Sequence, residues 1–267
     1  MDAMVEHDVL PEYVLDPMEI KSYKEEGWLL LPNMLDTVST EAARGDVREI
    51  LHGFGTSDEE LKQAAGVQSK LLQTGQYLNG TTIDRLVNSE RLNSVAAQLL
   101  GGEANLYFSF TAVKSGGGGG KFHFHQDNNY TQFTNGLDGL NIWFALVDMT
   151  PENGCLCIQP RSHLDGTLTS QNAGQGDGHQ SLGDDIGTYL PVRMRAGDAV
   201  AFSRLTVHGS GANKTPDPRF GYSIHYYRDD VMARWDGQEP RRLKEHPRWV
   251  TSGVDKITRD GNEVEPN

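Results

Sequence analysis

The sequence lacks the features that tie a chain to a membrane. No run of about 18 consecutive apolar residues occurs among its 267 residues, so a transmembrane helix is not expected. Residues 1–6, MDAMVE, are acidic and contain no apolar stretch, which argues against a secretory signal peptide. We therefore expect a cytoplasmic protein that does not bind membranes.

Basic residues are also scarce. The 24 Lys and Arg residues stand against 37 Asp and Glu residues, which gives a formal net charge of −13. Such a charge repels nucleic-acid phosphates and anionic lipid surfaces, so no nucleic-acid partner is expected. A small anionic ligand is not excluded, because one buried arginine can outweigh distant surface charge locally. The expected partner is a small-molecule substrate.

Cysteine is nearly absent. Cys155 and Cys157 alternate along a predicted strand, where a disulfide between them is geometrically unfavourable. A second thiol pair that could complete a zinc site does not exist in the sequence. We interpret both residues as small side chains packed in the core.

Strand-like segments separated by turn residues dominate the chain after residue 104, whereas the first part is helical. The predicted helices begin at Pro17, span Thr37–Phe54, run from Ser57 to Gly66, and span Ser89–Leu100. Predicted strands cover 28–31, 106–113, 121–127, 140–147, 155–159, 189–194, 198–203 and 220–228. This pattern predicts one mostly β domain with flanking α-helices over residues 1–267. It comprises a helical support (about 17–103), an antiparallel jelly-roll core (about 104–228) and an unplaced tail (229–267).

Residues 121–127, KFHFHQD, contain the first candidate metal ligands. Side chains two positions apart share a face of a strand, so His123, His125 and Asp127 are expected to point to one side. Two imidazoles and a carboxylate are costly to bury without a partner, and a divalent metal is a suitable partner. An isolated H-x-D pattern is a weak signal, since it occurs by chance in many proteins.

A second segment strengthens the metal hypothesis. Residues 197–210 form a turn and an apolar strand that leads to His208. Two histidines and one carboxylate with open positions suit non-haem iron(II), whereas zinc more often has a closed tetrahedral set. If 2-oxoglutarate chelates the iron through its keto-acid end, its far carboxylate needs a fixed, bidentate, charged donor, and Arg219, which opens the following strand, is well placed for that role. Ser210 can add a hydroxyl donor.

These motifs resemble the phytanoyl-CoA dioxygenase family from about Tyr23 to Tyr227. Residues 125–130, HQDNNY, match its H-Q-D-x-x-Y motif, and residues 152–156, ENGCL, match its E-N-G-x-L segment. Residues 159–163, QPRSH, are similar to its P-G-S-H segment, with Arg161 in place of the usual glycine. Residues 208–211, HGSG, match its distal segment.

The resemblance implies a double-stranded β-helix, a cupin-like jelly roll, that uses iron(II), 2-oxoglutarate and dioxygen. It implies His125, Asp127 and His208 as metal ligands and catalytic residues. The co-substrate contacts that it suggests are Arg219, Ser210 and Trp143, with Phe110, Lys114 and His123 on approaching strands as further candidates.

The implied activity is hydroxylation of a C–H bond of a small organic substrate, with release of succinate and carbon dioxide. Halogenation is disfavoured, because halogenases on this scaffold replace the carboxylate ligand and Asp127 is present. Desaturation, cyclisation and demethylation stay open, since they differ in substrate placement. Two further alternatives are a cupin-type metal enzyme without 2-oxoglutarate and a non-catalytic binding module. Either a monomer or a homodimer is expected.

Residues 165–187 are polar, rich in glycine and without periodicity. A loop of this length inside a compact domain is commonly functional, so we expect a lid over the site. His225 shares the strand parity of Arg219 and should face inward, where we interpret it as a hydrogen-bonded core histidine.

Overall fold

The computed structural model describes residues 9–53, 55–63, 77–78, 80–173, 180–183, 187–234, 239–243, 256–257 and 263–264.

Capping residues define the helices that precede the sheets. Asp16 accepts hydrogen bonds from the N–H groups of Met18 and Glu19, and the Glu19 side chain returns a bond to the Asp16 N–H. Ser89 caps the last of these helices, which ends where Gly101 adopts φ 69°. The helices are α1 (Pro17–Glu26), α2 (Thr37–Gly53), α3 (Asp58–Leu61), α4 (Thr82–Val87) and α5 (Glu90–Leu100).

Two antiparallel sheets form a sandwich. The five-stranded sheet has the order β1-β11-β6-β13-β3, and the four-stranded sheet has the order β10-β7-β12-β4. The first contains β1 (Trp28–Leu31), β3 (Ala104–Lys114), β6 (Gly139–Ala145), β11 (Ala199–Ser203) and β13 (Arg219–Arg228). The second contains β4 (Phe122–His125), β7 (Leu156–Ile158), β10 (Leu190–Pro191) and β12 (His208–Ser210). Neighbouring strands are distant in sequence, as in a jelly roll.

Short strands form three smaller sheets outside the sandwich. They are β2 (Tyr77–Leu78), β5 (Gln132–Phe133), β8 (Gln171–Asn172), β9 (Gln180–Ser181), β14 (Met232–Arg234), β15 (Arg241–Arg242), β16 (Lys256–Ile257) and β17 (Glu263–Val264). Strand β14 pairs with β5 and β15, so the start of the tail lies beside the turn that follows β4.

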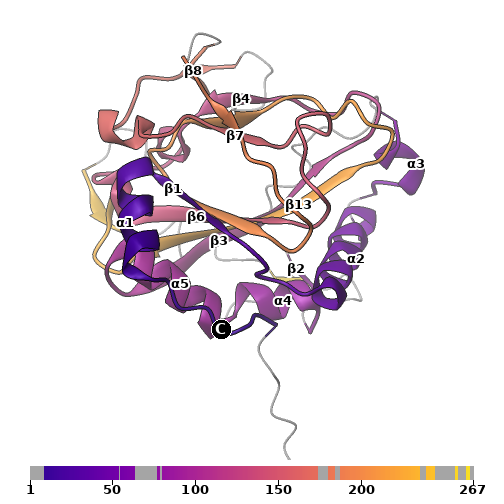
Figure 1. Ribbon diagram of the computed structural model, residues 1–267, viewed down its shortest axis with the longest axis horizontal. Helices are drawn as coiled ribbons and strands as arrows, with labels where there is room; N and C mark the ends of the chain where they lie inside the picture. Colours follow the sequence, from indigo (N-terminus) through magenta and orange to yellow (C-terminus); the bar gives the residue numbers. More distant parts are fainter. Residues whose placement is uncertain are drawn as a thin grey trace, which may run out of the picture.

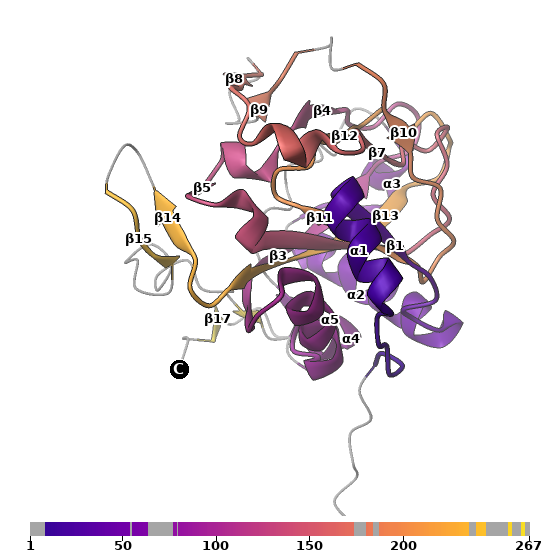
Figure 2. The ribbon, with the colours of Figure 1, turned by 60° about the vertical axis from the view of Figure 1, so that its left-hand side comes forward.

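The molecule has three layers, with α2, α4 and α5 below the five-stranded sheet and the four-stranded sheet above it, while α1 lies at the side beside β1 (Figures 1 and 2). Helix α5 contacts β3, β6 and β13, and α2 contacts β13. The lower layer packs through a cluster that includes Val47, Leu99 and Ile142. A second cluster, which includes Trp143, Ile158 and Phe202, joins the two sheets. The helices thus support one face of the large sheet and leave its other face to the site.

The predicted fold class, mostly β with flanking helices in a double-stranded β-helix, is confirmed by this architecture. Several local predictions were wrong in extent. The strand predicted at 121–127 ends at His125, the strand at 189–194 shortens to β10, and α4 was not predicted. Strand β1 pairs with β11 and completes the five-stranded sheet, although we had placed residues 17–103 outside the barrel.

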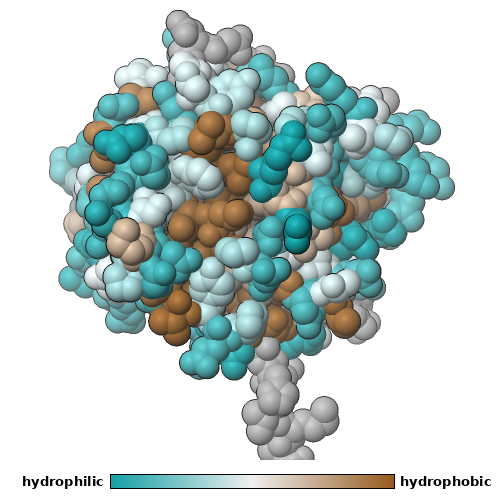
Figure 3. Space-filling view, viewed as in Figure 1, coloured by the Kyte–Doolittle hydropathy of each residue, from teal (hydrophilic) through white to brown (hydrophobic). Residues whose placement is uncertain are grey.

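The face in Figure 3 is largely hydrophilic, in keeping with the charge of −13, and apolar side chains gather near its centre. Among the described residues, no helix combines the length and the apolar character that crossing a membrane requires.

Candidate metal centre

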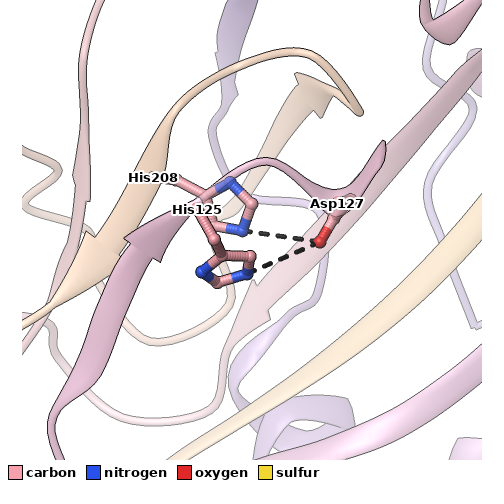
Figure 4. Close-up of side chains that lie close together, drawn as sticks. All are labelled: His125, Asp127 and His208. Atoms are coloured by element: carbon pink, nitrogen blue, oxygen red, sulfur yellow. Dashed lines mark ion pairs between the residues drawn. The ribbon is translucent and has the colours of Figure 1, made fainter. Parts of the chain in front are cut away.

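The three predicted metal ligands meet between the two sheets (Figure 4). His125 ends β4, and His208 opens β12 directly opposite it in the antiparallel register. Asp127 is not on a strand; it begins a 3-10 turn over Asp127–Asn129. All three residues are buried, and one ligand atom from each lies within 4.8 Å of the others.

Backbone carbonyls orient the two histidines. His125 Nδ1 lies 2.7 Å from the carbonyl of His123, and His208 Nδ1 lies 2.9 Å from that of Thr206. With Nδ1–H donating to a carbonyl, each ring presents a bare Nε2, the form that binds metals. These Nε2 atoms lie 3.8 Å (His125) and 3.6 Å (His208) from Asp127 Oδ1. The arrangement therefore offers two nitrogens and one oxygen to a single point.

Asp127 is held as a carboxylate. Burial alone would raise its pKa, but electrostatic interactions with His208, His225, Arg204 and His125 outweigh burial and lower the pKa to about 2. Arg204 also donates from Nη2 to the carbonyls of Asp127 and Thr131, at 2.9 Å each, and its guanidinium lies 4.1 Å from the ring centre of Phe133. Arg204 thus fixes the turn that carries the ligand.

The proposed co-substrate residues face the same cavity as the metal ligands. Arg219, Ser210, Trp143 and Phe110 all line it. Arg219 donates to the carbonyls of Gly154 (3.1 Å) and Ala112 (3.0 Å). Its guanidinium lies 5.2 Å from the Trp143 ring, and its buried Nε has no hydrogen-bond partner among the described residues. Burial lowers the pKa of Arg219 to about 9, so it stays charged at neutral pH.

His123 does not line this cavity, although strand parity predicted that it would face the ligands. Phe122 lines it instead, together with His125. The reason is a register shift: His208 pairs with His125 and Ser210 pairs with Phe122, so one extra residue lies in β4. Such a bulge reverses the alternation of side chains. The half-buried His123 contributes its carbonyl to His125 rather than a side chain to the site.

His225 is at the site rather than in the core away from it. Its Nδ1 lies 3.7 Å from Asp127 Oδ2, and its ring stacks on Phe108 with centres 4.3 Å apart. Burial lowers the pKa of His225 to about 3, which keeps the imidazole neutral. The sequence predicted that His225 faces inward on the same side of its strand as Arg219. It did not predict that His225 lies beside Asp127.

The remaining residues of the HQDNNY motif hold the segment that was predicted to be a lid. Gln126 donates to Gly166 O and accepts from Leu168 N, and Asn129 donates to Leu168 O. Tyr130 accepts from Gln180 N. The polar motif therefore links the ligand turn to the described part of residues 165–187.

Aromatic side chains form the rest of the cavity wall. The cavity has a volume of about 950 Å³, with the open space at its mouth included. Tyr107, Phe108 and Tyr130 belong to it, and sequence reasoning assigned the first two no role. Thr131, Asn141 and Arg204 supply its other polar groups that were not predicted. Lys114 lies behind the wall, where burial and the charge of Arg219 lower its pKa, and it donates to Gly211 O.

Comparison with known proteins identifies the family. Residues 23–221 match the profile of the family described as phytanoyl-CoA dioxygenase (PhyH). The ectoine dioxygenase of Halomonas elongata is 27% identical over 237 residues, which cover 81% of this chain and 71% of that protein. The methylphosphonate hydroxylase of Gimesia maris is 28% identical over 235 residues, which cover 84% of each chain.

A solved structure shares the fold. The epimerase SnoN, in complex with Fe3+, alpha ketoglutarate and nogalamycin RO, superposes with a TM-score of 0.60 at 23% identity and covers 83% of this chain and 86% of its own. The jelly roll, the clustered His-Asp-His residues and the profile match over most of the sequence agree. The chain therefore belongs to the phytanoyl-CoA dioxygenase family of iron(II)- and 2-oxoglutarate-dependent oxygenases.

Proposed function

We propose that the protein hydroxylates a C–H bond of a small organic substrate, using iron(II), 2-oxoglutarate and dioxygen and releasing succinate and carbon dioxide. The observation that carries the proposal is that the His125, Asp127 and His208 cluster and the buried Arg219 face one cavity. A group of metal-binding side chains alone would fit many enzymes. The buried guanidinium of Arg219 in the same cavity adds a site for the far carboxylate of a keto acid.

The donor set fits iron(II). Two imidazole nitrogens and one carboxylate oxygen are the facial set of non-haem iron oxygenases, and it leaves open positions for a chelating co-substrate and dioxygen. The buried Asp127 Oδ1 that lies against both Nε2 atoms suits a cation between them. When bound, iron supplies the activation of dioxygen that protein side chains cannot provide.

The chain's own residues bind and orient 2-oxoglutarate. Two of the Arg219 nitrogens are held by backbone carbonyls, so the guanidinium is fixed, and its charge is available to a carboxylate. Ser210 lines the cavity near the start of the distal segment and can donate its hydroxyl. Trp143 covers the guanidinium face and excludes water, which strengthens the charge interaction.

Aromatic rings form much of the cavity wall. Tyr107, Phe108 and Phe110 line it, so a substrate with an apolar surface is favoured. A dry wall also keeps water from the reacting centre. We expect a protein that acts on small molecules in the cytosol as a monomer or homodimer.

Other outcomes on the same scaffold stay as alternatives. Desaturation, cyclisation or demethylation require the same ligands and Arg219, and they differ in where the substrate is held. Among proteins with this fold, SnoN is an epimerase and SnoK is a carbocyclase. A cupin-type enzyme without 2-oxoglutarate has no use for a buried Arg219, and this favours hydroxylation over that alternative.

The test is co-substrate turnover. Protein reconstituted anaerobically with iron(II) is mixed with 2-oxoglutarate and candidate small molecules and is then exposed to dioxygen. Succinate is expected, together with a product 16 mass units heavier than its substrate, the mass of one inserted oxygen. Absence of 2-oxoglutarate binding and of succinate across a broad panel would refute the proposal. A product two mass units lighter, which has lost two hydrogens, would replace hydroxylation with desaturation or cyclisation.

A further inference from the structure

Two buried polar atoms beside the metal ligands face each other without a hydrogen bond. Asp127 Oδ2 and His225 Nδ1 are 3.7 Å apart, and neither has a partner among the described residues. The two side chains are 11% and 2% exposed, so water is largely excluded. A buried carboxylate oxygen without a donor is destabilising, so this oxygen requires a donor, and His225 Nδ1 is the unpartnered nitrogen that faces it.

The carboxylate divides its two oxygens between different neighbours. Oδ1 lies against Nε2 of His125 and Nε2 of His208, where a metal would be bound. Oδ2 points the other way, toward the ring of His225 on β13. This orientation suits a carboxylate that binds a metal through one oxygen only.

We propose that His225 donates its Nδ1–H to Asp127 Oδ2 and so holds Asp127 as a ligand through Oδ1 alone. The proposal rests on the metal site proposed above. His225 is a positioning residue, since it acts on the metal through Asp127. The observed 3.7 Å exceeds a hydrogen bond, and we expect it to shorten when the metal draws the carboxylate into place.

The surroundings of His225 fix its ring. The ring stacks on Phe108 at an interplanar angle of 16° and lies 5.5 Å from the Phe110 ring. On its other edge, Nε2 lies 3.2 Å from Ser223 Oγ, which is 2.8 Å from Asn141 Oδ1. The imidazole can therefore turn little, and Nδ1 stays aimed at Asp127.

The proposal specifies one tautomer. A neutral imidazole carries one hydrogen, so Nδ1–H requires Nε2 to accept from the Ser223 hydroxyl. The Asn141 side chain then presents its amide nitrogen to Ser223, which a half-turn of the amide group achieves without moving its heavy atoms. The opposite tautomer would set a bare nitrogen against a carboxylate oxygen.

One-oxygen ligation matters for the number of open positions. His125, His208 and one oxygen of Asp127 would hold the iron and leave positions open for a chelating 2-oxoglutarate and dioxygen. A second oxygen from Asp127 would take one of these. Partners that orient metal ligands typically change metal affinity by 10–100-fold when they are removed.

The first test measures cobalt(II) binding to the full-length protein by visible absorption, without co-substrate. His225→Phe keeps an aromatic ring against Phe108 and removes the donor, and we expect it to weaken cobalt binding by about 10–100-fold and to shift the absorption bands. His225→Asn can place an amide nitrogen near the position of Nδ1, and we expect it to stay within about 3-fold of the wild type. Thermal unfolding of the metal-free variants reports whether they fold.

The second test reads the tautomer without mutation. Nitrogen-15 NMR of the zinc-loaded wild type separates Nδ1–H from Nε2–H imidazoles, and we expect Nδ1–H for His225. An Nε2–H signal would overturn the proposal, as would a His225→Phe variant with wild-type affinity and spectrum. Equal losses in the Phe and Asn variants would also overturn it, because they would indicate a packing role. A wild type that binds no metal would instead refute the metal site.

Discussion

Two buried arginines flank the site, and they differ in what surrounds the guanidinium. Arg204 is stacked on Phe133 and donates to two backbone carbonyls beside Asp127. Arg219 also donates to two carbonyls, but it lies at the cavity with Trp143 over its face. The first therefore supports the ligand turn, whereas the second can meet a ligand.

Removing Arg219 should affect co-substrate binding and not metal binding. Arg219→Ala leaves the far carboxylate of 2-oxoglutarate buried without a partner, which costs about 3 kcal/mol or more and weakens binding by roughly 100-fold. Calorimetric titration of the anaerobic iron-loaded protein measures the dissociation constant. The control Arg219→Lys keeps the charge but loses the bidentate geometry. Its dissociation constant for 2-oxoglutarate should lie between those of the wild type and the alanine variant. Unchanged 2-oxoglutarate affinity in the alanine variant would remove Arg219 from this role.

Removing Arg204 should affect folding stability first. Arg204→Met keeps an apolar stem beside Phe133 and leaves the carbonyls of Asp127 and Thr131 without their donor. Hydrogen bonds to charged groups contribute about 1.5–3 kcal/mol each, so we expect a loss of about 3 kcal/mol in the free energy of unfolding. Urea unfolding measures it, and a loss below about 0.5 kcal/mol would show that other donors replace the guanidinium.

The motif residues predicted from the sequence lie near one another. His125, Asp127, His208 and Arg219 line one cavity, and their roles stay predictions. The prediction that His123 faces the metal ligands was wrong. The register shift between His208 and Ser210 depends on how β12 pairs with β4, and the sequence does not show this pairing. The proximity of His225 and Arg204 to Asp127 depends on the packing of strands distant in sequence, which a single sequence does not record.

At the scale of elements, Gln126 makes the most buried link between the ligand turn and the segment after β7, beside the bonds of Asn129 and Tyr130. Gln126 is fully buried; its amide donates to Gly166 O at 2.8 Å and to Leu205 O at 2.7 Å, and it accepts from Leu168 N at 2.7 Å. The segment that we proposed as a lid is therefore anchored at the residue next to two metal ligands.

Loss of this anchor should loosen the proposed lid. In Gln126→Ala, the N–H of Leu168 loses its acceptor, so its hydrogen exchange should be faster by 10-fold or more, for a lost bond of about 1.5 kcal/mol. Substrate turnover should fall as well. The control Asn88→Ala removes an amide bond to Asp84 O at the end of α4 and should leave Leu168 unchanged. Normal turnover in Gln126→Ala despite faster exchange would show that the segment does not act as a lid.

The close approach of β13 to Trp143 makes a second element-scale prediction. A Cβ on Gly221 would lie 2.2 Å from Trp143 Cζ2, so Gly221→Ala must displace the ring that covers Arg219. Overpacking of this kind costs about 1–3 kcal/mol, and we expect roughly 10-fold weaker 2-oxoglutarate binding. Gly45→Ala on α2, where a Cβ meets nothing within 4 Å, is the matched control. Equal affinity in the two variants would exclude Trp143 as a co-substrate contact.

Elements with strong local signals were predicted well. Helix α1 begins at the predicted Pro17, and α5, β3 and β13 begin and end near the expected residues, because capping side chains and long apolar runs act locally. Strand β10 and helix α4 are short, so local sequence says little about them. The role of β1 in the large sheet follows from its pairing with β11, which is a tertiary contact.

For the whole molecule, the helical support and the sheets share one core. Leu99 of α5 is 3% exposed and belongs to the same cluster as Ile142 of β6 and Tyr226 of β13. Because this cluster crosses the boundary near residue 104, we propose that the chain folds as a single domain.

A core mutation in the support should therefore weaken the site and the helices together. Leu99→Ala should lower the free energy of unfolding by about 2–5 kcal/mol. Circular dichroism and tryptophan fluorescence should report the same single urea transition, at a lower midpoint. Two separate transitions, with the helical signal lost first, would divide the chain into independent folding units.

The position of the two histidine ligands has a consequence for the lifetime of the protein. They face each other on β4 and β12, and β4 is the edge strand of its sheet. A bound ion would join segments far apart in sequence, much as a covalent cross-link does, and would favour the folded state by mass action. In cells that lack iron, β4 should separate from β12 more often and expose the chain to proteases. The abundance of this protein is therefore expected to follow the iron supply through its rate of degradation.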